Sequence, residues 1–230
     1  MTKLPVLYIS CDTQALKAPR GQASLRRLIR GREVCSVVFI RLSAGLDAPE
    51  IHCPAGTSQV AGELRSLLSA GDFSPVASAS GTGDLETLAT TLVSPASVEV
   101  AELRLDVGMP GDYYRSIGQR LEGFRDHGVL IICFDELTAT EVNGAVPPPH
   151  DAYIRNLINQ WEDEMRWARA FSKSGMGKEA GVGPGEPLRN PTLCMLNIAF
   201  SLGGLKAPQR VFSSALNEGR QSLAGYGWMQ

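Results

Sequence analysis

Histidine is scarce in this chain of 230 residues, in which His52, His127 and His150 are the only examples. No group of His, Cys and carboxylate residues has the spacing of a recognisable zinc or iron site. No apolar run approaches the roughly 18 residues that a membrane-spanning helix needs. The N-terminus passes directly into a strand-like stretch, without the charged and apolar regions of a secretion signal. We therefore expect a cytoplasmic protein with no membrane partner.

A concentrated positive charge is also missing, because the formal net charge is −2. The densest basic stretch consists of Arg26, Arg27, Arg30 and Arg32. These residues have helical spacing and no interleaved aromatic run. The pattern is typical of a solvated helix face, and we expect no nucleic-acid partner.

The five cysteines are irregularly spaced and contain no Cys-x-x-Cys pair. Disulfides are rare in the cytosol, so free thiols are expected. Cys35, Cys133 and Cys194 lie in apolar runs, which predicts that they are small core residues. A glycine-rich segment at 173–187 predicts a flexible loop. Its Gly-Met-Gly-Lys sequence lacks the other residues of a phosphate-binding loop.

Strand-like and helix-like segments alternate along the chain. Strands are predicted at 5–10, 35–41, 98–105, 129–134 and 210–216, and helices at 59–70, 112–127, 151–171 and 190–202. The run at 129–134 is continuously apolar, as in a strand covered on both faces, whereas 98–105 alternates as a half-buried strand does. We therefore predict one α/β domain over 1–230, with a mostly parallel or mixed sheet and helices on both faces.

Polar side chains follow several of these strands. They are Cys11 and Asp12 after the first, Arg41 and Ser43 after the second, Asp135 and Glu136 after the central strand, and Asn217 and Glu218 after the last. Ligands of open α/β sheets bind beyond the carboxyl ends of the strands. If the first three strands are parallel neighbours, a thiol, three carboxylates and a guanidinium meet at one edge and can shift one another's pKa values. Such residues also commonly cap helices or shape turns. His150 is a further candidate, because it follows three prolines and precedes a helix.

Several segments, in the right order, resemble the class III extradiol ring-cleavage dioxygenases (the LigB and DOPA-dioxygenase superfamily). Residues 111–132, which include Leu-Glu-Gly-Phe-Arg-Asp-His-Gly-Val-Leu-Ile-Ile, are similar to the family helix that runs into Val-Leu-Ile-Ile. Weaker likenesses occur at 7–10, 37–51, 147–150, 190–192 and 216–219. The resemblance implies an α/β fold and a pocket for an aromatic or polyketide-like compound.

The chain departs from this family at its histidines. Cys11 stands at the first metal-ligand position, the second falls at or near Ser43, and the third falls at Asn217. The histidine that acts on the substrate aligns with Thr82, and two other family histidines correspond to Ala139 and Asn190. Cys, Ser and Asn are not expected to reproduce a histidine-rich site that activates oxygen. We therefore expect no metal or other cofactor.

Three functions are compatible with these residues. The first is a metal-independent enzyme that performs cyclisation, isomerisation, dehydration or C–C lyase chemistry on a phenolic or polyketide-like intermediate of a biosynthetic pathway. Cys11, Asp12, Asp135, Glu136 and His150 would be its catalytic groups. Arg41, Ser43, Thr82, Asn217 and Glu218 would bind the substrate. The second is a non-catalytic binding or assembly subunit, and the third is a dioxygenase with an unconventional metal site. The resemblance to this family also implies that the protein is a homodimer.

Overall fold

The computed structural model describes residues 3–10, 19–53, 58–71, 73–78, 83–93, 98–135, 188, 191–206, 208–216 and 221–229. Its strands are β1 (Val6–Ser10), β2 (Ser36–Ser43), β3 (Glu50–His52), β4 (Val76–Ser78), β5 (Glu99–Asp106), β6 (Val129–Asp135), β7 (Gln209–Leu216) and β8 (Gln221–Trp228). Its helices are α2 (Pro19–Ile29), α3 (Gln59–Ser69), α4 (Gly83–Leu92), α5 (Gly111–Leu121), the 3-10 helix η1 (Glu122–His127) and α9 (Pro191–Leu202).

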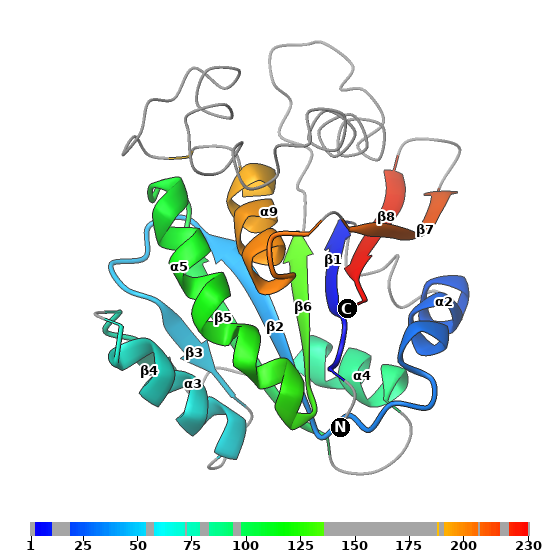
Figure 1. Ribbon diagram of the computed structural model, residues 1–230, viewed down its shortest axis with the longest axis horizontal. Coiled ribbons are helices and arrows are strands. Elements are labelled where there is room, and N and C mark those ends of the chain that lie inside the picture. The colour runs from blue at the N-terminus through cyan, green and yellow to red at the C-terminus, as the bar shows by residue number, and fades with distance from the viewer. Residues whose placement is uncertain are drawn as a thin grey trace.

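These strands form one sheet in the order β4-β3-β5-β2-β6-β1-β8-β7 (Figure 1). The central strands β5, β2, β6 and β1 are mutually parallel. Strands β3 and β8 pair antiparallel with β5 and β1, so the sheet is mixed. The predicted α/β fold is therefore confirmed. None of the helices within the described ranges is long and apolar enough to cross a membrane.

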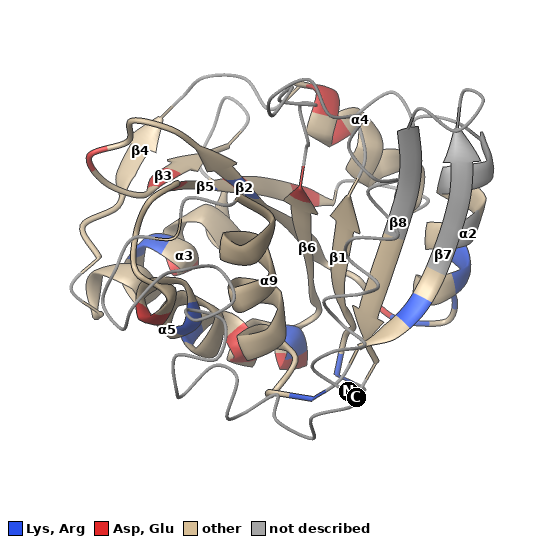
Figure 2. Cartoon of the chain, turned by 90° about the horizontal axis from the view of Figure 1, so that it is seen from above, with Lys and Arg blue, Asp and Glu red and all other residues tan. Residues whose placement is uncertain are grey.

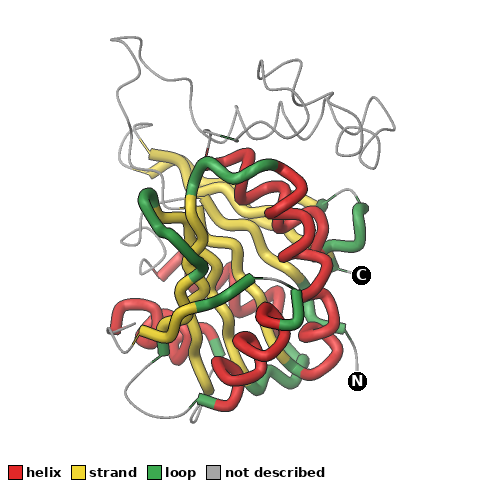
Figure 3. Tube along the Cα trace, turned by 90° about the vertical axis from the view of Figure 1, so that its left-hand side faces the viewer, coloured by secondary structure: helices red, strands yellow, loops and turns green. Residues whose placement is uncertain are grey.

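Helices cover both faces of the sheet, as the view from above shows (Figure 2). On one face, α3, α5 and α9 pack on alternate residues of the strands, such as Tyr8, Ile40 and Cys133. On the other face, α2 and α4 pack on the intervening residues, such as Ile9, Phe39 and Phe134. Because side chains alternate along a strand, a strand covered on both faces is apolar over most of its length. Every residue of β6 is accordingly buried. Figure 3 shows the sheet between its two helical layers.

Two predictions about burial were wrong. Strand β5 was predicted to be half-buried, but Glu102, one of its polar residues, is almost completely buried, because ion pairs described below satisfy its charge. Cys35 was predicted to be a core residue and is exposed. It lies just before β2, where its backbone N–H donates to Gly128 O over 2.8 Å, so the backbone rather than the side chain is anchored.

The predicted helix at 112–127 is divided between α5 and η1. Gly128 follows with φ of 77°, the left-handed conformation that glycine adopts without strain, and thereby ends the helical segment as predicted. The strands at β3, β4 and β8 were not predicted. The predicted helix at 151–171 and the glycine-rich loop at 173–187 lie outside the described residues.

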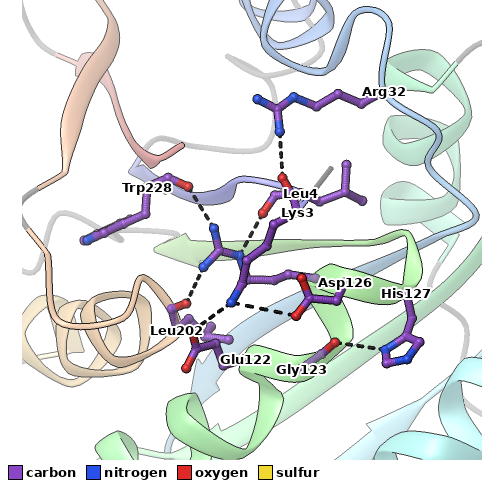
Figure 4. Close-up of polar contacts among 10 residues, drawn as sticks. Lys3, Leu4, Arg32, Glu122, Gly123, Asp126, His127, Leu202 and Trp228 are labelled. Atoms are coloured by element: carbon purple, nitrogen blue, oxygen red, sulfur yellow. Dashed lines mark hydrogen bonds and ion pairs between the residues drawn. The ribbon is translucent and has the colours of Figure 1, made fainter. Parts of the chain in front are cut away.

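A buried guanidinium of η1 contacts three other elements near the amino-terminal end of β1. Arg125 is 1% exposed. It donates to Leu4 O at 2.7 Å, Leu202 O at 2.8 Å and Trp228 O at 3.2 Å, and so connects η1 with β1, α9 and β8. Figure 4 shows these carbonyl groups beside the Lys3 ammonium, which pairs with Glu122 at 2.9 Å. Burial lowers the pKa of Arg125, and the acids of η1 oppose that effect.

Candidate functional site

The candidate site lies where β1, β2 and β6 end. These strands are parallel, with β6 between the other two, so their carboxyl ends meet at one edge of the sheet (Figure 1). Ser10 pairs with Asp135 across the β1–β6 ladder and therefore projects to the same face. Helix α9 begins at this edge and covers that face. The condition stated from the sequence, that these strands are parallel neighbours, is thus met.

Asp135 is held by two hydroxyl groups from distant parts of the chain. Tyr8 Oη donates to its Oδ2 over 2.6 Å. Thr192 Oγ1, in the first turn of α9, donates to the same oxygen over 2.9 Å. The carboxyl group is buried, with 4% of Asp135 exposed. A carboxylate beside a helix N-terminus is also favoured by the helix dipole. These contacts tie α9 to the sheet and orient the carboxyl group.

Burial controls the ionisation of this pair. It raises the pKa of Asp135 from 3.8 to about 6, although the hydrogen bonds from Tyr8 and Thr192 act in the opposite direction. Burial likewise raises the pKa of Tyr8 well above its usual value, and the neighbouring Asp135 carboxylate raises it further. The carboxyl group can therefore exchange a proton near neutral pH, while the phenol remains protonated.

Ser10 adds a third hydroxyl group on this face. It is fully buried and lies close enough to Tyr8 to lower the pKa of the phenol. Its Oγ makes no hydrogen bond of ordinary geometry within the described part of the chain. A buried polar atom without a partner costs stability unless another group or water satisfies it. Ser10, Tyr8, Asp135 and Thr192 together form what we call the Asp135 cluster.

The sequence did not single out Tyr8 or Thr192. Tyr8 looked like an ordinary strand residue, and Thr192 attracted notice only within the Asn-Pro-Thr resemblance. One signal was available for Tyr8, which lies two residues before Ser10 and hence on the same face of β1. Nothing local could have paired Thr192 with Asp135.

Arg41 belongs to a second group, on the opposite face. Its guanidinium lies 5.8 Å from the centre of the Phe134 ring, and Phe134 faces away from the Asp135 cluster. Arg41 Nη1 lies 3.3 Å from Glu102 Oε1. Arg104 also pairs with Glu102, through Nε at 2.8 Å and Nη2 at 3.1 Å. The expected convergence of Arg41 and Asp135 is therefore only partly right: they share an edge of the sheet, but their side chains leave opposite faces.

Ser43 ends β2 and is half-buried. Its carbonyl accepts from Val107 N–H over 3.0 Å. The adjacent Asp106 Oδ1 accepts from Gly45 N–H at 2.8 Å and Leu46 N–H at 3.1 Å. The Asp106 carboxylate therefore fixes the turn after β2, a role that polar residues at strand ends commonly have.

The remaining predicted site residues lie outside the described residues. They are Cys11, Asp12, Thr82, Glu136, His150, Asn217 and Glu218. Among the described histidines, His52 is buried and lies 2.8 Å from Glu50 Oε2, while His127 is exposed, as predicted. Within the described ranges no three His, Cys, Asp or Glu side chains form a group that could hold a metal ion.

Comparison with known proteins gives a structural likeness only. No protein-family model matches the chain, and no curated protein matches its sequence. The crystal structure of the uncharacterized protein JW3007 from Escherichia coli K12 is similar, with a TM-score of 0.65 and 15% sequence identity. The match covers 98% of this chain and 99% of that one. At this identity the likeness establishes a shared fold over nearly the whole chain and carries no function.

Proposed function

We propose that this protein is an enzyme with a fold like that of the extradiol dioxygenases, and that it transfers protons through Asp135 without a metal. The observation that carries the proposal is the buried Asp135 carboxyl group with its pKa near 6, at the carboxyl edge of the sheet. The sequence supports metal independence, because Cys11, Ser43 and Asn217 replace the ligand histidines of the family it resembles.

Burying a carboxylate is costly, and a fold that needed only a link between α9 and β6 could use neutral groups. A general base works best when its pKa lies close to the working pH. Asp135 meets this requirement, and its deprotonated form predominates at neutral pH. Tyr8 and Thr192 hold its Oδ2. They thereby limit rotation of the carboxyl group, as positioning of a reacting group demands.

The reaction that fits best is proton removal from carbon beside a carbonyl or phenolic group. The Asp135 carboxylate would take the proton, and the resulting carboxylic acid would return it to another atom of the same molecule. Isomerisation and cyclisation follow when the proton returns to carbon or oxygen, and dehydration follows when it leaves with a hydroxyl group. C–C lyase chemistry would use the same group. Cys11 is a candidate second acid, base or nucleophile in this proposal.

Arg41 would bind an anionic part of the substrate at the same edge. Its side chain is 28% exposed, whereas its partner Glu102 is 1% exposed. The ion pair with Glu102 and the contact with the Phe134 ring hold the guanidinium in place. The expected substrate is therefore a phenolic or polyketide-like molecule with a carboxylate or an enolate. It would extend over the sheet edge from the Asp135 cluster to Arg41.

The test is turnover of candidate pathway intermediates by the wild-type protein and by Asp135→Asn. Loss of a general acid or base lowers rates on the order of 100- to 10,000-fold. The control is Asp47→Asn, which removes an exposed carboxylate from the turn after β2. Thr192→Val provides a finer test, because the Thr192 hydroxyl lowers the pKa of Asp135. The acidic limb of the pH–rate profile should move to higher pH in this variant.

Equal turnover in wild-type and Asp135→Asn proteins would refute the assignment. Absence of turnover with every candidate would favour the non-catalytic subunit. Stoichiometric iron or zinc that is lost on Cys11→Ala would indicate the unconventional dioxygenase instead.

A further inference from the structure

A groove lies at the other edge of the sheet, away from the Asp135 cluster. It is a groove of about 540 Å³ between the end of α2, the turn that follows it and the end of α4. Helices α2 and α4 both run from the carboxyl edge of the sheet to the amino edge, because each precedes the start of a parallel strand. The groove therefore has no residue in common with the proposed active site. Its volume is within the range of small-molecule sites, about 300–1,000 Å³.

Four of the residues that line this groove are arginines: Arg26, Arg27, Arg30 and Arg32. Two of them are anchored to the backbone. Arg26 Nε donates to Thr91 O over 2.6 Å, and Arg32 Nη1 donates to Lys3 O over 2.7 Å. Each bond uses one of the five N–H donors of a guanidinium. Arg27 and Arg30 are exposed. Within the described ranges, no carboxylate forms an ion pair with any of the four.

Helix dipoles explain only part of this charge. The C-termini of α2 and α4 each carry a partial charge of about −0.5, so some basic residues are expected there. Four guanidinium groups carry more positive charge than these two helix ends would balance. The adjacent Lys3 is already paired with Glu122 and Asp126. The groove is therefore electropositive in a chain whose formal net charge is −2.

The inner surface of the groove is apolar. Ile29 and Leu92 are buried beneath it, and Val34 and Val93 are half-buried along its wall. An apolar wall with several convergent charged groups is the usual composition of a site for a small organic anion. Guanidinium forks bind phosphate oxygens in pairs. A nucleic-acid surface would instead extend over a strongly basic domain, whereas this chain has a pI of about 6.0.

We propose that the groove binds a small organic di- or triphosphate. Its phosphate groups would contact Arg27 and Arg30. Arg26 and Arg32, which backbone carbonyl groups hold in place, would lie beside them. The organic part would lie against Val34 and Val93. The site is independent of the Asp135 chemistry and could regulate that activity or retain a phosphorylated compound.

Calorimetric titration tests this proposal, with ATP and inorganic tripolyphosphate as probes in magnesium-free buffer. Saturable binding of ATP at one site per chain is expected. ATP should bind more tightly than tripolyphosphate, because only ATP has an organic part for the wall. Arg27→Gln/Arg30→Gln should weaken ATP binding by about ten-fold or more, since two charged hydrogen-bond donors are lost. Raising the salt concentration should weaken binding as well.

The matched control is Arg65→Gln, which removes an exposed guanidinium from α3 on the opposite face of the sheet. It should leave ATP binding unchanged. Urea unfolding of the double variant should match that of the wild type, because Arg27 and Arg30 lie on the surface. The proposal is overturned if ATP does not bind, if the double variant binds ATP as tightly as the wild type, or if a single-stranded RNA 20-mer binds more tightly than ATP.

Discussion

Replacing Asp135 with asparagine would separate the charge of this residue from its shape. An asparagine side-chain oxygen can still accept hydrogen bonds from Tyr8 and Thr192, which both reach Oδ2 in the native protein. The ionisation disappears, and an NH2 group takes the place of Oδ1. Burial raises the pKa of Asp135 to about 6 in the folded protein, whereas an aspartate of the unfolded chain titrates near pH ~3.9. The substitution therefore probes the cost of a buried carboxylate.

The sign of the effect follows from proton binding. Between pH ~4 and pH ~6 the folded protein holds the Asp135 proton more tightly than the unfolded chain does. The free energy of unfolding therefore falls as pH rises through this window and is highest, for this group, below it. A shift of roughly two pKa units corresponds to about 3 kcal/mol. Relative to the wild type, Asp135→Asn should gain up to this amount of stability between pH 4 and pH 7.5.

Urea unfolding followed by tryptophan fluorescence at several pH values between 4 and 7.5 measures this difference. Asp47→Asn is the control, because it removes a carboxylate that is exposed and not buried. A stability difference between wild type and Asp135→Asn that stays constant across the window would refute the raised pKa. It would also remove the main support for Asp135 as a proton-transfer group. A gain in stability together with a loss of turnover is the expected combination for a strained functional residue.

Three further substitutions test the buried Arg125, the packing at Gly203 and the ion pairs of Glu102. Arg125→Met should lower the free energy of unfolding by about 3–5 kcal/mol in urea titration, because buried carbonyl groups lose their charged donor. Gly203→Ala should destabilise the protein in a thermal scan, since a Cβ atom there would overlap the Trp228 ring. Glu102→Gln should weaken the holding of Arg41 and Arg104 and raise the KM for an anionic substrate more than it lowers kcat.

The outcomes that would contradict these expectations are equally specific. An Arg125→Met protein as stable as Arg65→Met, which alters an exposed arginine of α3, would show that the buried hydrogen bonds contribute little net stability. An unchanged melting temperature for Gly203→Ala would mean that the Trp228 ring can move. If Glu102→Gln changed only kcat, Glu102 would act on the reaction step and not on substrate binding.

Much of the fold was predictable, because its signals are local. The apolar run of β6 requires cover on both faces, and Pro191 with the apolar residues after it marks the start of α9. The exceptions are elements defined by their partners. Strand β8 contains Gly225 and Gly227, which have little intrinsic strand preference, and it is a strand because it pairs with β1 and β7.

The candidate site was predictable in part. Asp135 follows an apolar strand, which places a carboxyl group at the carboxyl edge of the sheet. The hydroxyl groups that hold it are 127 and 57 positions away in the sequence. Arg41 was correctly placed at the same edge, yet side-chain alternation directs it to the other face. A one-residue shift of β2 against β6 would reverse the face on which Arg41 lies relative to Asp135, and only the strand pairing in the structure reveals the register.

The sequence by itself determined the α/β class, the parallel centre of the sheet and the position of an acidic residue at its edge. Each of these depends on local hydrophobic periodicity and on residue type. The tertiary structure decided the chemistry of that residue. Asp135 is an ordinary carboxyl group in the sequence, and its pKa reaches about 6 because α9 and β1 exclude water from it. Desolvation depends on what is packed around a group, and chain order alone does not specify that.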